Sequence, residues 1–269
     1  MTLPDLATSP ETTGRARSGL QYRIHGTVQQ TVIIDLAPGQ TVFSDAGGMS
    51  WMSGTVEMNT HSGGGLGGMV KRAFSGATLF VIDFTSPRAP GQVAFASDFP
   101  GKILAFELDA GESMTMHKHS FVCAEKSVQL DITFTQKLGA GLVGGEGFIL
   151  QKVTGPGMVF AELDGDPVEY RLKLGETMKI EPGHIAMFEP TVTFDITRIK
   201  GIKNMLFGGE GIFLGTLTGP GRIFLHSMTV HKMAHRIGES LPGRAESGNA
   251  ASGVVGAVIG SVLGGGRRD

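Results

Sequence analysis

The stretches "GEGFILQKVTGPG", residues 145–157, and "GEGIFLGTLTGPG", residues 209–221, share eight of thirteen positions at an offset of 64 residues. A glycine-rich stretch can cradle a phosphate, but one that recurs at a fixed offset indicates a repeated structural unit. In each copy the Thr-Gly-Pro-Gly segment fits a type II turn, with proline at i+1 and, at i+2, a glycine that can take the required positive φ. We therefore predict that Gly157 and Gly221 shape a hairpin that the fold uses more than once.

The repeat reaches beyond these two stretches. The segment "GATLFVIDFTSP" (76–87) is a more distant copy. A second block, Leu-x-x-Gly-Glu/Gln-Ser/Thr-apolar, occurs three times, at 36–42, 108–114 and 172–178. Apolar and polar residues alternate in 127–134 and 191–199, a pattern that is typical of half-buried strands.

These repeats predict an all-β chain of three units, about 22–100, 101–165 and 166–227, within one domain that covers 21–237. A unit of this size buries too little apolar surface to stand alone comfortably, so we expect the three to form one body with pseudo-threefold character. We expect a flexible N-terminus over 1–20, a short helix over 228–237 and a linker with an apolar tail over 238–269. Ser227 is the expected N-cap of the helix and Gly238 its expected stop.

Composition excludes several classes of protein. The net charge of −2 gives no basic surface for nucleic acid, and a single cysteine excludes an intrachain disulfide framework and a cysteine-based zinc site. The first twenty residues contain no apolar signal-peptide core, and no run reaches the ~18 apolar residues of a membrane span. We expect a cytoplasmic protein that can lie at the inner face of a membrane. Glycine, at 42 of 269 residues, is about twice as frequent as the usual ~7% and favours many tight turns.

Two motifs suggest ligands, and we interpret both as structural. The segment "GAGLVG" (139–144) matches GxGxxG but is followed by a strand pattern, whereas a dinucleotide site requires a helix there. The pair His117 and His119 lies in a His-x-His segment of the kind that holds metal in cupin-type barrels. In the repeat alignment Asp45 and Glu181 match His117, and these side chains could converge only if the units face a common axis. We predict no metal and no cofactor, with a cupin-like metal or small-ligand site as the alternative.

The remaining reactive residues have simple structural interpretations. Trp51, Cys123 and Met187 occupy the same position of the three units, and we expect all three to fill the core. His231 and His235 lie four residues apart on the expected helix, without the glutamate of a zinc protease, and are interpreted as surface residues. No catalytic signature of paired carboxylates or of a nucleophilic serine is present, so we predict that the protein is not an enzyme.

Two segments favour contact with a partner. The loop 61–76 combines many glycines with apolar residues and two cations, which suits a partner or a bilayer surface. In the tail, Gly256, Gly260 and Gly264 form a stripe among apolar residues, and such small residues allow helices to approach closely. Two arginines follow this uncharged stretch and suit an anionic surface. The alternative is a disordered or interfacial tail.

The motifs "GGGLGGMVKRAFSGATLF", "GQVAFASDFPGKILAFEL" and the two opening stretches resemble the AIM24 family, over about residues 20–235. The resemblance implies a β-rich body of repeated units, related to the double-stranded β-helix and similar to subunits of the Trp RNA-binding attenuation protein. It also implies oligomers, often trimers, and, for mitochondrial relatives, a link to inner-membrane organisation and respiratory-complex integrity. It supplies no catalytic residue. The segment "TSPRAPG" (85–91) departs from the family's commoner T-G-P-G-G form.

The sequence thus predicts a non-enzymatic, oligomeric all-β scaffold protein, soluble or attached to the periphery of a membrane. Its expected partners are other copies of itself, with a trimer favoured, and a membrane surface reached through the tail. Nucleic acid is not an expected partner.

Overall fold

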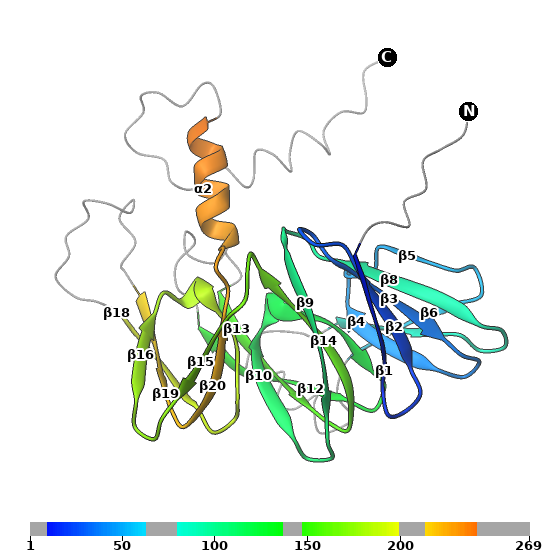
Figure 1. The fold of residues 1–269 in the computed structure, drawn as a ribbon, viewed down its shortest axis with the longest axis horizontal. Helices are drawn as coiled ribbons and strands as arrows, with labels where there is room; N and C mark the ends of the chain where they lie inside the picture. Colours follow the sequence, from blue (N-terminus) through cyan, green and yellow to red (C-terminus); the bar gives the residue numbers. More distant parts are fainter. Residues whose placement is uncertain (1–9, 63–79, 137–146, 199–212, 241–269) are drawn as a thin grey trace.

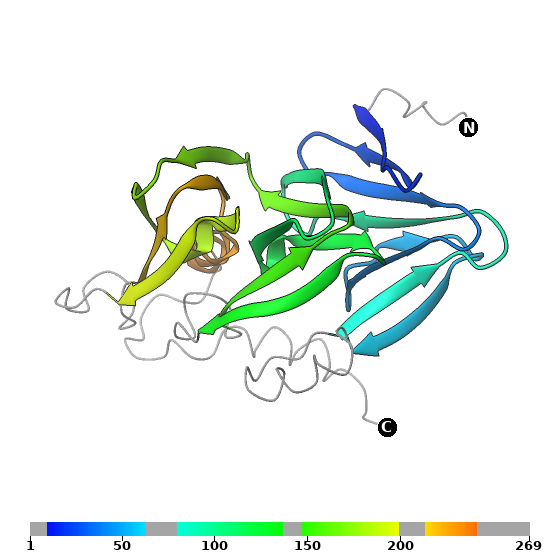
Figure 2. The ribbon, with the colours of Figure 1, turned by 90° about the horizontal axis from the view of Figure 1, so that it is seen from below.

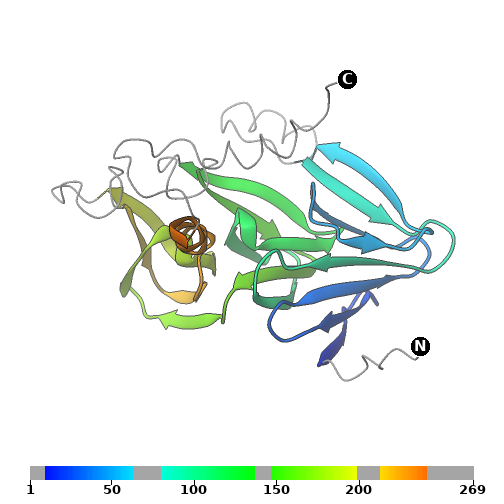
Figure 3. The same cartoon turned by 90° about the horizontal axis from the view of Figure 1, so that it is seen from above.

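A computed structural model describes residues 10–62, 80–136, 147–198 and 213–240. In these ranges the chain forms antiparallel sheets and one short helix, which confirms the all-β class. Three groups of strands follow one another along the longest dimension of the molecule (Figure 1). The views from below and from above show the same row, with the helix end-on over the last group (Figures 2 and 3).

Each group contains six strands. The first group is β3 (Thr31–Leu36), β4 (Thr41–Asp45), β5 (Trp51–Met52), β6 (Glu57–Ser62), β7 (Phe80–Thr85) and β8 (Gly91–Ala96). The second is β9 (Gly101–Leu108), β10 (Ser113–His117), β11 (Phe121–Glu125), β12 (Gln129–Gln136), β13 (Phe148–Thr154) and β14 (Gly157–Asp164). The third is β15 (Val168–Leu172), β16 (Thr177–Ile180), β17 (Ile185–Phe188), β18 (Thr193–Arg198), β19 (Phe213–Thr218) and β20 (Gly221–Leu225).

The strand pairing is the same in all three groups. In the first, β8 lies between β3 and β5, and β7 lies between β4 and β6. The second repeats this with β14 between β9 and β11 and β13 between β10 and β12. The third does so with β20 between β15 and β17 and β19 between β16 and β18. We call these groups units 1, 2 and 3; the superposition of their Cα traces stays a prediction.

Neighbouring units are joined by strand pairing in one register. Strand β4 of unit 1 pairs with β11 of unit 2, where Phe43 lies opposite Ala124. Strand β10 of unit 2 pairs with β17 of unit 3, where Thr115 lies opposite Phe188. Each junction therefore fuses half of one unit with half of the next into a six-stranded sheet.

The hydrophobic core lies across these junctions. The cluster in unit 1 contains Cys123 and Phe160 of unit 2, and the cluster in unit 3 contains Phe148 and Leu150 of unit 2. The middle cluster takes residues from all three units, among them Phe43 and Met187. Because no cluster belongs to one unit alone, the three units share their burial and form one body.

The Thr-Gly-Pro-Gly segments are corners between sheets, so the predicted hairpin is wrong. Strand β13, before the corner, pairs with β10 and β12, whereas β14, after it, pairs with β9 and β11. The peptide bonds before Pro156 and Pro220 are cis, which a type II turn does not have. The positive φ holds, at 139° for Gly157 and 145° for Gly221. The repeat indicated a turn, but the partners of its flanking strands are set by tertiary pairing that the local sequence does not encode.

The first residues of the body differ from the expected flexible terminus. Strand β1 (Glu11–Arg15) pairs with β2 (Gln21–His25), and β2 pairs with β3, so residues 11–25 extend the sheet of unit 1. The turn between β1 and β2 reaches unit 2: the Arg17 amide donates to Glu107, and Ser18 donates to Glu125. The polar composition of this segment concealed a hairpin that is held by distant carboxylates.

The predicted C-terminal helix is present as α2 (Val230–Ser240) and stands away from the sheets (Figure 1). Its N-cap is Thr229, whose hydroxyl accepts from the Lys232 amide at 3.3 Å, and not Ser227 as predicted. Gly238 lies within α2 and does not stop it. Ser227 instead accepts from the Asp166 amide at 2.7 Å, which fixes the chain just before the helix.

Candidate functional site

His117 and His119, which the sequence singled out, lie together where units 2 and 3 meet, whereas His231 and His235 lie on α2. His117 ends β10, and the short 3-10 turn η1 (Lys118–Ser120) carries His119 next to it. The two imidazole centroids are 5.2 Å apart, and the His117 ring stacks on Phe148 at 5.0 Å. His117 is buried, and its Nε2 has no hydrogen-bond partner among the residues that the structure describes.

The sequence analysis missed the central residue of this cluster, His226. Its Nδ1 accepts from the Asp164 amide at 2.8 Å, so the neutral ring carries its proton on Nε2, which lies 3.2 Å from the Ser120 hydroxyl. Its carbonyl accepts from Nδ1 of His184, in the second 3-10 turn η2 (Pro182–His184), at 2.7 Å. His226 thus connects both turns to the base of α2, and no local motif marked it because its partners come from three segments.

Burial keeps the rings of His117 and His226 neutral. Burial lowers the pKa of His117 to about 3, with smaller contributions from His119, His226 and Lys118. Burial also lowers the pKa of His226 to about 4, with further contributions from His184 and His119. His117 and His226 are therefore uncharged at neutral pH, and they contribute packing and hydrogen bonding where units 2 and 3 meet.

The proposed metal ligands do not converge. His117 and His119 lie together, but within the parts of the chain that the structure describes no three His, Cys, Asp or Glu side chains form a group that could hold a metal. Asp45 ends β4, at the junction of units 1 and 2, where burial raises its pKa to about 6 and Lys118 opposes this. Glu181 lies in unit 3 and pairs with Lys232 at 2.7 Å. The repeat places the three matched residues in different units of a row, not around one axis.

A second group of buried acids was also missed. Burial, together with Asp164 and Asp98, raises the pKa of Glu162 to about 8. Burial, together with Asp98, raises the pKa of Asp164 to about 6. Glu162 and Asp164 lie on β14, whereas Asp98 lies just before β9, and this distance in sequence left no motif.

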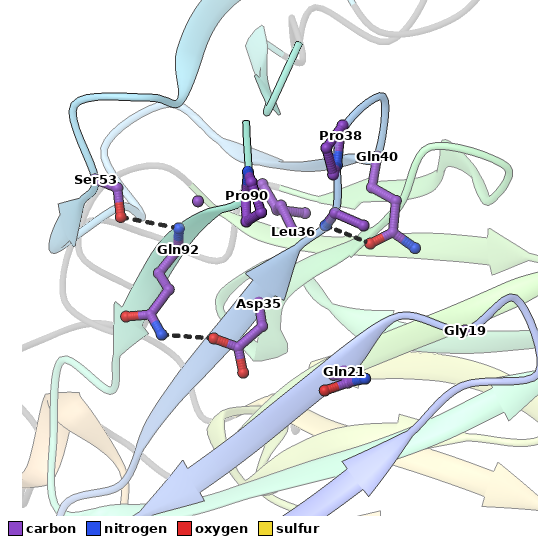
Figure 4. Close-up of a pocket in the computed structure, with 11 residues that line it drawn as sticks. Gly19, Gln21, Asp35, Leu36, Pro38, Gln40, Ser53, Pro90 and Gln92 are labelled. Atoms are coloured by element: carbon purple, nitrogen blue, oxygen red, sulfur yellow. Dashed lines mark hydrogen bonds between the residues drawn. The ribbon is translucent and has the colours of Figure 1, made fainter. Parts of the chain in front are cut away.

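A pocket of about 410 Å³ opens on unit 1 (Figure 4). Its walls are the loop after β3, the end of β5 and the start of β8, with Pro38 and Pro90 as apolar surfaces. Its carboxylate, Asp35, accepts from Gln92 at 2.6 Å and from Arg23 at 3.5 Å. Because Asp35 is already bonded, the pocket offers apolar and amide surface and no group poised for chemistry.

The two ends of the row each present a strand edge without a described partner. Trp51 in β5 was expected in the core with its counterparts, but it is 52% exposed, whereas Cys123 and Met187 are 0% and 2% exposed. Burial raises the pKa of the Cys123 thiol well above its usual value. Among the described strands, none pairs with the outer edge of β5 or of β16. Figure 1 places these strands at opposite ends of the molecule.

Several predicted features lie outside the described residues. They are the GxGxxG segment 139–144, most of the loop 61–76, and the tail glycines Gly256, Gly260 and Gly264. In the described part of the chain no helix has the length and apolar character to cross a membrane.

The recurring six-strand unit and the two corners lie within the region that comparison with known proteins covers. A family model described as "Mitochondrial biogenesis AIM24" matches residues 22–228. The chain belongs to the AIM24 family. It is 28% identical over 233 residues to an uncharacterized protein of Streptococcus pyogenes serotype M6, a match that covers 83% of this chain and 92% of that protein. A crystal structure of a Streptococcus pyogenes protein has a TM-score of 0.66 with 25% identity, covering 84% of this chain and 100% of the other. These matches confirm the family that the sequence motifs indicated.

Proposed function

We propose that this AIM24 protein is a non-enzymatic scaffold that works as a homo-oligomer, with a trimer as the size that the family resemblance favours. The observation that carries the proposal is the contrast between the junctions inside the row and its two ends. At each internal junction the position of Trp51 is closed to solvent by a strand of the preceding unit, whereas at the end of the row it is open. Exposed edge strands are usually covered in natural proteins, often by another subunit.

Tryptophan fluorescence can test this proposal, since Trp51 is the single tryptophan of the chain. We expect the native mass of the purified full chain, measured by light scattering, to be a multiple of 28.3 kDa. We also expect Trp51 emission to shift to shorter wavelength, and its quenching by acrylamide to fall, as concentration rises through association. A monomeric mass at all concentrations, with Trp51 quenched as in a free peptide, would contradict the proposal.

A membrane contact is the second candidate, and α2 is the observation that favours it. Val230 and Ile237 are 39% and 52% exposed, and they lie with Met233 and Ala234 at the i, i+3, i+4, i+7 spacing of one helix face. The tail that follows α2 carries no charge from Ser247 to Gly266 and then two arginines. A helix with an apolar face next to such a segment suits the surface of an anionic bilayer.

Deletion of residues 247–269 tests this second candidate. We expect the deletion to leave the native mass of the body unchanged and to reduce sedimentation with vesicles that contain anionic lipid. Vesicles of neutral lipid alone are the control. Equal sedimentation of both chains would remove the membrane contact, and monomers after deletion would make the tail the oligomerisation element.

The cupin-like alternative rests on His117 and His119 alone. Elemental analysis of the purified protein tests it, and we expect no stoichiometric zinc, iron or manganese. Bound metal that disappears in the His117→Ala variant would favour a ligand-binding function over the scaffold.

A further inference from the structure

We propose that copies of this chain join head to tail, with the outer edge of β16 in one copy paired antiparallel with the outer edge of β5 in the next. The proposal rests on the proposed function, because it requires self-association, and it specifies which edges meet, in which direction and in which register.

The order of strands in the two junction sheets indicates which edges would meet between copies. The two junction sheets have the orders β6-β7-β4-β11-β14-β9 and β12-β13-β10-β17-β20-β15. Each consists of a three-stranded half from one unit and the complementary half from the next. Among the described strands, two halves remain without their complement, β18-β19-β16 of unit 3 and β5-β8-β3 of unit 1, the latter extended by β2 and β1. Joined through β16 and β5, they give the order that the molecule already contains twice.

The register follows from positions counted from the corners; in unit 1 the corner runs from Thr85, which ends β7, to Gly91, which begins β8 in another sheet. Met52, Ala124 and Phe188 each lie opposite the residue two places after a corner glycine, namely Val93, Val159 and Ile223. Phe43, Thr115 and Lys179 each lie opposite the residue two places before a corner threonine, namely Asp83, Lys152 and Thr216. Inside the molecule the pairs are Phe43 with Ala124 and Thr115 with Phe188. The third pair is therefore Lys179 with Met52 of the next copy.

The next pair in the same register explains the exposure of Trp51. At the second junction Met116 lies opposite Met187, and both are buried. The corresponding residues at the ends are Ile180 and Trp51. A cross-strand pair of an aromatic and a β-branched residue stabilises a sheet relative to a pair of alanines. The pairing would bring the exposed Trp51 indole beside Ile180 and cover it.

The two ends cannot meet within one chain, because they lie at opposite ends of the row (Figure 1). The strand that pairs with each of these edges consequently belongs to another copy of the chain. Since β5 and β16 are different surfaces, the contact is heterologous, and repetition closes into a ring or continues as a filament according to the rotation between copies. A symmetrical dimer that joins two β5 edges would be a different assembly.

Cysteine pairing in trans tests edge, direction and register together. One full-length chain carries Lys179→Cys and another carries Met52→Cys, and they are mixed and oxidised under mild conditions. Opposed residues of paired antiparallel strands have Cα separations of about 4.5–5.5 Å, within the range that a disulfide spans. Both chains keep Cys123, which is fully buried. The matched control replaces Lys179→Cys by Thr177→Cys, an exposed position on the same strand two residues out of register.

We expect a disulfide-linked dimer from the Lys179→Cys and Met52→Cys mixture, loss of that dimer with Thr177→Cys, and no dimer from either variant alone. Far-UV circular dichroism and melting of each variant establish that it is folded. Dimers from Met52→Cys alone would indicate paired β5 edges and would overturn the proposal. A native oligomer without the matched disulfide would overturn the head-to-tail register and leave the scaffold function standing. A monomer would overturn both.

Discussion

The internal junctions and the open ends of the row use the same strands in the same arrangement, yet they differ in what they expose. At one structural position Cys123 and Met187 are closed to solvent, while Trp51 is 52% exposed. Within the unit, the strand that pairs with each of these residues is equivalent. Each of the three residues lies opposite the residue three places after a corner glycine. The difference arises from the neighbouring strand, which is present at the junctions, whereas no described strand of the same chain pairs with the end.

This comparison separates two roles of one repeat position. At the junctions it fills a shared core, and at the end it forms the largest side chain of an unpaired edge. A sequence alignment of the repeats places the three residues in one column and cannot say which of them has a unit on both sides.

The largest contrast is expected between alanine substitutions at the two kinds of site. Met187→Ala should lower the free energy of unfolding by about 2–5 kcal/mol, because it leaves a cavity in the middle core cluster. Trp51→Ala should cost much less in dilute monomer, because half of the side chain is already in solvent. Urea unfolding of both variants at low protein concentration measures the difference. Equal losses would mean that the end of the row is as well packed as the junctions.

The buried acid at the first junction gives a pH-dependent contrast. Burial raises the pKa of Asp45 from 3.8 to about 6, so its stabilising contribution is present below pH 3.8 and is lost as pH rises to 6. In the parent, Asp45 should therefore lower the free energy of unfolding by about 3 kcal/mol as pH rises across this window. The Asp45→Asn variant should not show this decrease. Glu181→Gln, at the matched position of unit 3, weakens only partly exposed contacts with Lys232 and His184 and should change stability by less than ~1 kcal/mol. Urea unfolding at pH 4 and pH 7 checks both variants, and a parallel pH dependence in the parent and Asp45→Asn would refute the role of Asp45.

Substitutions at the two corners should cost similar amounts of stability, although Gly157 lies in the middle unit and Gly221 in the end unit. Gly157→Val and Gly221→Val should each cost more than ~1 kcal/mol, because valine is strained at positive φ. Their new Cβ atoms would also lie 2.7 Å from Ser127 and from Thr191, respectively. Gly39→Ala is the control: it also has positive φ, but its Cβ would meet no atom within 4 Å. Thermal melts should show similar losses at the two corners and a smaller loss at Gly39, whereas no loss at a corner would disprove the conformation described there.

The smallest effect is expected where the units differ by one surface pair. Arg222 bonds to Glu189 through its side chain at 2.6 Å and through its backbone amide at 2.9 Å, and Met158 holds the same place in unit 2. Arg222→Met should cost no more than ~1 kcal/mol, because the pair is partly exposed and the backbone bond remains. Chemical unfolding in low and high salt checks this, since only the parent should be weakened by salt through this pair. A larger loss would show that the pair organises the edge of unit 3.

The fold class and the family could be predicted from sequence because they depend on local patterns. Alternation in 127–134 and 191–199 foretold β12 and β18, and the recurrence of the corners indicated repeated units. The hairpin interpretation failed because β13 and β14 find their partners in different sheets, and such long-range pairing is set by tertiary packing. The terminal segment failed for a similar reason, since Arg17 and Ser18 are fixed by residues of unit 2.

The candidate sites were less predictable than the fold. His117 and His119 were found because they are neighbours in sequence, but His226 and Glu162 acquire their surroundings only when distant strands meet. The exposure of Trp51 could not be anticipated either, because burial at that position depends on the place of the unit in the row. Sequence therefore identifies which residues are equivalent, and the structure decides which equivalents share an environment.

The hairpin of β1 and β2 has a consequence for biosynthesis. The carboxylate that accepts the hydrogen bond from the Arg17 amide belongs to Glu107, 90 residues later in the chain. The carboxylate that accepts from the Ser18 hydroxyl lies 107 residues later. At translation rates of roughly 5–20 residues per second, the anchor for the N-terminal turn leaves the ribosome about 5–20 s after the turn itself. During that interval the nascent chain presents an unanchored hairpin, and the emergence of unit 2 sets the moment at which unit 1 is secured.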